Sequence, residues 1–134
     1  MYDKFKEIAD TNGWEFFYAR RDFLNLEADE GKEDKVHLMV DPIVIQNQFD
    51  EYGNLDGKTY SGHFMLLMSS SFNDTTYEEK YLEHIKPLLI EAEKELMDGF
   101  ACSDFTLSFW QSVEIINAFD FNYDGLIINY QIMK

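Results

Sequence analysis

Apolar side chains recur along this chain with two different periods, which separates expected helices from expected strands. Near the N-terminus they lie three and four residues apart, which predicts a short helix over residues 2–11 that ends at Asn12-Gly13. The same spacing returns over residues 75–99 and predicts a longer helix that ends at Gly99. Both helices are therefore expected to bury one face.

The long helix carries a start signal and an interruption. Residues 73–76 offer N-cap side chains, and Glu78 or Glu79 completes a capping box three residues later. Pro87 lies inside the apolar stripe. Because a proline ring clashes with the preceding helical turn, we expect Pro87 to kink or split this helix.

Five further segments have the composition or the period of strands. These are residues 14–19, 36–46, 60–71, 105–116 and 126–132. The fourth alternates strictly, which predicts six side chains on one face of the strand: Phe105, Leu107, Phe109, Gln111, Val113 and Ile115.

Residues 36–71 are predicted to form one long hairpin. Pro42 cannot donate a ladder hydrogen bond, so the first strand is expected at a sheet edge or with a bulge there. The tip, residues 47–59, is polar, and Asp56-Gly57 is a strong turn signal. This tip is too long for a tight turn, and we expect it to project as an arm.

The order of these elements predicts an α+β fold. We expect an antiparallel or mixed sheet with a long hairpin arm, covered by one long helix and a short N-terminal helix. At 134 residues and 15.9 kDa, the whole of residues 1–134 fits a single domain.

Charge narrows the range of functions. Eleven Lys and Arg against 26 Asp and Glu give a net charge of −15, although 46% of the residues are hydrophobic. Such a balance argues against general binding to nucleic acid or to anionic membranes. It favours a basic partner, a cation, or a surface that repels DNA. The acids gather in residues 22–34, an expected mobile loop, and along residues 74–98, so we expect one acidic surface beside less charged ones.

Neither a membrane-spanning run nor a hydrophobic signal core occurs in the sequence, and we expect a cytosolic origin. Cys102 is the only cysteine, and with no basic cluster beside it we expect a buried structural thiol.

One stretch resembles half of a calcium loop. Asp120, Asn122, Asp124 and Gly125 have the spacing of its first half, but Gln131 stands where a bidentate Glu is needed. The flanks alternate with the period of strands, so a tight hairpin is favoured, with a cation site as the alternative.

No other motif predicts chemistry. His37, His63 and His84 lack zinc-site spacing and are expected to be solvated or at the edge of the core, although His37 and His63 could face each other across the hairpin. The serine run 69–71 has no identifiable base. We therefore predict no catalytic, cofactor-binding or metal-binding residue, and no enzymatic activity.

Two stretches carry a resemblance to known proteins: residues 49–67 at the hairpin tip and residues 117–129 at the C-terminus. Together with the element order, they resemble the tail-completion or tail-terminator and head–tail connector proteins of tailed phages and prophages. The resemblance implies a structural subunit that assembles as a homo-oligomeric ring with other tail or connector proteins. It implies localisation in the virion, and in the host cytoplasm during assembly.

A ring needs heterologous interfaces, for which the arm is the natural candidate. Its interface residues are expected to be Phe49, Tyr52, Leu55 and Tyr60. An acidic lining would also let DNA slide through the ring without binding.

Two alternatives remain. The first is an acidic inhibitor or DNA mimic that binds a basic enzyme. The second is a small module that binds a ligand in an apolar pocket between sheet and helix.

Overall fold

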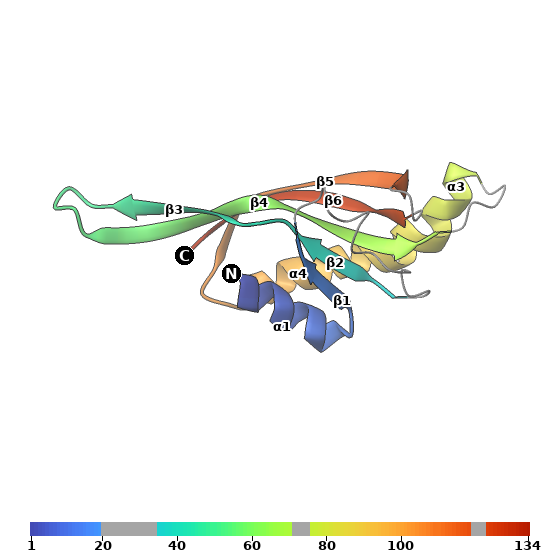
Figure 1. Ribbon diagram of the computed structural model, residues 1–134, viewed down its shortest axis with the longest axis horizontal. Coiled ribbons are helices and arrows are strands. Elements are labelled where there is room, and N and C mark those ends of the chain that lie inside the picture. The colour runs from blue at the N-terminus through green and yellow to red at the C-terminus, as the bar shows by residue number, and fades with distance from the viewer. Residues whose placement is uncertain (20–34, 71–75, 119–122) are drawn as a thin grey trace.

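The protein has the predicted α+β fold, seen in a computed structural model that describes residues 1–19, 35–70, 76–118 and 123–134 (Figure 1). Its six strands are β1 (Glu15–Tyr18), β2 (His37–Val40), β3 (Val44–Phe49), β4 (Leu55–Ser69), β5 (Thr106–Ala118) and β6 (Tyr123–Met133). They form one mixed sheet in the order β1-β2-β4-β6-β5, with β3 also paired to β4. Only the β1–β2 pair is parallel among these five pairings.

The short helix α1 (Tyr2–Asn12) is confirmed, together with its end. Gly13 adopts the left-handed conformation, with φ 71°, and its N–H donates to the carbonyl of Asp10, while the N–H of Trp14 donates to that of Ala9. Glycine tolerates this conformation without steric cost, so it stops the helix where the chain turns into β1.

The long helix is also confirmed, but its middle is not α-helical. It runs as α3 (Tyr77–Lys80), the π-helical η2 (Tyr81–Leu89) and α4 (Ile90–Ala101), two residues beyond the expected end. Thr76 and Glu79 form the capping box. Pro87 lies within η2, where the wider turn gives its ring room, so the helix continues without splitting.

One face of the sheet packs against this helical layer (Figure 1). Leu66, Ile128 and Val40 from neighbouring strands meet Phe5 of α1 and Leu96 of α4 in one continuous buried cluster. All five side chains are fully buried, so the space between sheet and helices is filled by side chains.

A smaller core lies on the other face of the sheet. Met39, Met65, Leu67 and Tyr123 are buried there. They alternate along their strands with the residues that face the helices, so the middle of the sheet is apolar on both sides.

The arm is formed by β3 and the first half of β4, and it reaches beyond the helical layer (Figure 1). β6 also pairs with β4 from Thr59 onward, so only the tip of the arm, around Phe49 and Leu55, is a two-stranded ribbon. The predicted strand 36–46 is interrupted at Asp41-Pro42, which ends β2 and lets β3 start at Val44. The chain reverses at residues 50–54. The expected turn at Asp56-Gly57 is wrong, because both residues lie inside β4. A register shift between Gln48 and Phe49 of β3 leaves Asp56 as one extra residue in β4.

The strict alternation predicted for residues 105–116 is also wrong. A register shift between Leu107 and Phe109 adds one residue to β5. As a result Leu107 and Trp110 both pack on the helical side, whereas Phe109 and Val113 are about half exposed (49% and 50%). A bulge reverses which face each later side chain occupies.

Candidate functional site

The arm carries five of the 14 exposed large apolar side chains of the described residues. Of the four predicted interface residues, Phe49, Tyr52 and Leu55 are 62%, 81% and 53% exposed. Phe49 and Leu55 are cross-strand partners, so their side chains share one face of the ribbon. Tyr52 lies in the turn between them. Tyr60 lies instead at the root of the arm, partly buried, with its ring 6.0 Å from that of Phe105.

The sequence reading missed two further residues of the arm. Val44 and Ile45 are 60% and 59% exposed, and Ile45 lies opposite Tyr60. Both residues lie in or beside the predicted strand 36–46, which was expected to continue in the body of the sheet. The break at Asp41-Pro42 ends β2 and places Val44 and Ile45 in β3, on the arm. An exposed apolar surface of this kind marks an interaction site more often than a free surface.

The tip of the arm is held by one carboxylate. Asp50 Oδ1 accepts hydrogen bonds from the backbone N–H groups of Tyr52 and Asn54, at 2.9 and 2.8 Å. Its Oδ2 accepts from the side-chain amide of Asn54 at 3.0 Å. The Asn54 bonds hold the pKa of Asp50 below its ordinary value, although the carboxylate is exposed. Gly53, with φ 83°, completes this turn.

Two lysines mark the root of the arm. Lys58 and Lys134 bond each other through their backbones, with both N···O distances 2.9 Å. The Lys134 ammonium lies 5.1 Å from the centre of the Phe105 ring. Neither lysine forms an ion pair with a carboxylate among the described residues. Together with Leu55, Asp56 and Tyr60 they line a hollow of about 310 Å³, so one acid lies beside the two lysines.

The outer faces of the helices are acidic, as the sequence predicts for residues 74–98. The exposed acids of α3, η2 and α4 are Glu78, Glu79, Glu83, Glu91, Glu95 and Asp98. Lys94 pairs with Glu91 at 3.6 Å, whereas Lys80 is buried and donates to Ser70 Oγ at 2.9 Å. The acidic segment 22–34 lies outside the described residues.

At the end of the stretch 120–125, which resembles half of a calcium loop, the side chains of Asp124 and His84 join the sheet to the long helix. Asp124 lies in β6, is fully buried, and bonds His84 Nδ1 through Oδ2 at 2.7 Å. Its flanking segments are strands, as expected, while Asp120 and Asn122 lie outside the described residues. Among the described residues no three His, Cys, Asp or Glu side chains gather as a metal site would require. The bond between Asp124 and His84 ties η2 to the sheet.

The other two histidines do not face each other. His37 lies opposite Leu67, not His63, and is buried between the rings of Phe17 and Tyr123. His63 lies nearer the arm and pairs with Asp41. His37 is therefore a core residue, contrary to the expectation of a solvated or edge position.

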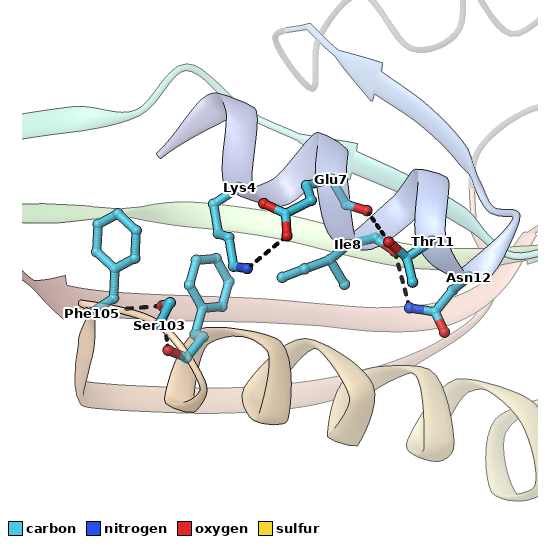
Figure 2. A network of polar contacts seen from close by, with 8 residues as sticks. Lys4, Glu7, Ile8, Thr11, Asn12, Ser103 and Phe105 are labelled. Atoms are coloured by element: carbon cyan, nitrogen blue, oxygen red, sulfur yellow. Dashed lines mark hydrogen bonds and ion pairs between the residues drawn. The ribbon is translucent and has the colours of Figure 1, made fainter.

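A groove of about 260 Å³ separates α1 from α4. Figure 2 shows the α1 side, where Lys4 pairs with Glu7 at 3.1 Å and Asn12 donates to the carbonyl of Ile8. Cys102 lines this groove and is exposed, so the expected burial of its thiol is wrong. The α4 helix ends just before Cys102, and that ending turns the thiol outward.

Among the described residues, no helix combines the length and the apolar character needed to cross a membrane. Comparison with protein-family models and with curated proteins finds no match to this chain.

Proposed function

We propose that this protein is a ring-forming structural component of a phage or prophage tail or connector, similar to a tail terminator and without catalytic activity. The observation that carries the proposal is the arm, whose two-stranded tip holds Phe49 and Leu55 more than half exposed. A two-stranded ribbon is marginally stable on its own, so its apolar face is expected to pack against another surface.

The distribution of charge supports the same function. Acids cover the outer faces of the helices, whereas β5 contains Glu114 as its one charged residue. A ring with the helical acids toward its channel would repel DNA, which carries one charge per roughly 1.7 Å of duplex. The sheet edges would then be left for contacts between subunits.

The test is the oligomeric state of the purified protein. Light scattering after size exclusion, followed by negative-stain electron microscopy, is expected to show closed rings. Substituting Phe49→Ser together with Leu55→Ser removes the apolar face of the arm tip, and we expect the rings to dissociate. Tyr77→Ser, at a residue 70% exposed on α3, is the matched control and should leave them intact. Wild-type protein that stays monomeric at high concentration would contradict the function.

A second candidate rests on the acidic helical face. An inhibitor that docks on a basic enzyme would present Glu91, Glu95 and Asp98 to its partner. It predicts a monomer or dimer and salt-sensitive capture of a basic protein. Replacing these three acids by amides would abolish such capture but would leave arm-mediated rings in place.

A further inference from the structure

Two edge strands of the sheet, β3 and β5, carry few of the charged residues that commonly protect an edge against pairing. β3 contains no charged residue among its 6, and β5 contains one among its 13, in a chain that is 28% charged. Natural edge strands are commonly kept short or carry charges, because an open edge is a template for another strand. The third edge strand, β1, does follow this practice, with only 4 residues and a Glu15–Lys35 ion pair.

The two unprotected strands lie on opposite sides of the sheet. β2 and β3 pair with the same edge of β4, whereas β6 and then β5 follow on its other edge. Among the described residues nothing pairs with the outer side of β3 or of β5. Opposite, non-identical edges are what head-to-tail assembly needs.

The strand directions fit such an assembly. β3 is antiparallel to β4, and β5 runs in the same direction as β4 because two antiparallel pairings separate them. A second copy placed with its sheet continuing the first would therefore bring β3 beside β5 in the antiparallel sense, which is the more stable pairing. Since β3 lies along residues 55–61 of β4 and β6 along residues 59–69, successive copies would be staggered, as the closure of a sheet requires.

Charged residues of opposite sign lie near the two pairing segments. Lys58, the cross-strand partner of Asn47, and the neighbouring Lys134 lie beside β3 without a carboxylate partner among the described residues. On the other side, β5 carries exposed Glu114 and is bordered by α4, whose Glu93 accepts hydrogen bonds from Trp110 and Ser112. Lys58 and Lys134 thus place positive charge near β3 that can face the acidic border of β5, although Asp50, Glu51 and Asp56 keep the arm as a whole acidic.

We propose that β3 of one subunit adds to the free edge of β5 in a second copy of this chain, so that the sheet runs on from subunit to subunit. The pairing uses Val44–Gln48 of β3 and the regular stretch 109–115 of β5, between its two register shifts. This inference rests on the proposed ring-forming function and specifies how the ring is closed.

The test places a lysine on each edge in turn. Ile45→Lys blocks β3 and Val113→Lys blocks β5, at residues that are 59% and 50% exposed, so neither change empties the core. Each alone is expected to raise the concentration needed for assembly by roughly tenfold to a hundredfold, since it replaces a buried apolar contact by a charge. Leu82→Lys, 52% exposed on η2, adds the same charge away from both edges and should change nothing.

Mixing the two blocked chains gives the sharper result. Each retains one open edge, so equal amounts should form a 1:1 heterodimer that grows no further, while each chain alone stays monomeric. Homodimers of either blocked chain would overturn the proposal, because they would show pairing of like edges. Unchanged rings in both variants would overturn the edge pairing and leave the ring-forming function standing. A wild-type dimer or open filament that both lysines disrupt would support the pairing and contradict the ring.

Discussion

At the scale of single residues, the hydroxyl of Tyr130 is the least expected feature of the core. It is buried, and it has no hydrogen-bond partner among the described residues. Its ring packs on Phe5 and Phe64, with centroids 5.5 and 5.7 Å apart. A buried hydroxyl without a partner costs free energy that a phenyl ring would not.

We therefore predict that Tyr130→Phe stabilises the protein by about 1 kcal/mol at neutral pH, measured by urea unfolding. Tyr77→Phe, on an exposed ring, should leave the stability unchanged.

Burial first, then the nearby Tyr18 and Asp41, raise the pKa of Tyr130 above its ordinary value of 10.0. A raised pKa means that its contribution to stability is lost as pH rises, because above pH 10 the unfolded chain releases this proton more readily. The advantage of the variant should therefore grow above pH 10, and a gap that narrows there would contradict this cause.

Asp50 provides a residue-scale prediction at acidic pH. Its pKa lies below the ordinary 3.8, so its stabilisation of the turn is present above that value and is lost as pH falls through the lower, folded pKa. We expect the amide resonances of Tyr52 and Asn54 to shift in that range. Asp50→Asn should abolish the pH dependence while keeping an acceptor oxygen, and Asp50→Ala should fray the turn at every pH. Fraying that extends into β4 would show that the turn also stabilises the pairing of β3 with β4.

At the scale of elements, two glycines lie at close contacts of different kinds. The contact at Gly125 involves the backbone of a neighbouring strand, whereas the contact at Gly99 involves only a side chain. A Cβ at Gly125 in β6 would come within 2.5 Å of the carbonyl oxygen of Leu66 and 2.4 Å of Leu67 Cδ2. One at Gly99 in α4 would meet only the side chain of Ile8, at 2.7 Å.

Gly125→Ala is expected to cost about 2–3 kcal/mol, because the backbone of β4 cannot move aside without breaking its pairing with β6. In Gly99→Ala the strain on Ile8 is offset by the gain in helix propensity, roughly 0.5–1 kcal/mol, so the net change should be small. Thermal unfolding of the two variants measures the difference. Equal losses of stability in the two variants would contradict this, because they would show that Ile8 cannot move aside in the contact between α1 and α4.

The elements also show which features of the fold a local sequence pattern can predict and which it cannot. Capping at Thr76 and the stop at Gly13 depend on neighbours within a few residues, and both were predictable. The bulge after Leu107 and the π-helical path around Pro87 were not, because they are fixed by pairing with β6 and by packing on the sheet. The same limit applies to the candidate site: Phe49, Tyr52 and Leu55 were singled out from the sequence and are exposed on the arm, whereas Val44 and Ile45 were missed.

At the scale of the whole molecule, charge should govern how readily the subunits associate. A net charge of −15 makes copies repel one another, and two lysines at the root of the arm offset little of it. We predict that raising NaCl from about 0.05 to about 0.5 M promotes assembly, because the Debye length falls below 10 Å. Sedimentation at several salt concentrations measures this. Assembly that weakens with salt would contradict this prediction, because it would show that ion pairs between subunits outweigh the overall repulsion. In that case the double substitution Lys58→Gln and Lys134→Gln should remove the dependence of assembly on salt.

The sequence by itself determined the kind and order of the elements, the α+β fold and the acidic helical face, because periodicity, capping and charge are properties of near neighbours. Tertiary structure alone decided which strand edges are unpaired among the described residues, which side chains the arm exposes, and that Asp124 bonds His84. Each of these depends on contacts between residues far apart in the chain. Pairing register and burial are set by such contacts, and a linear pattern does not contain them.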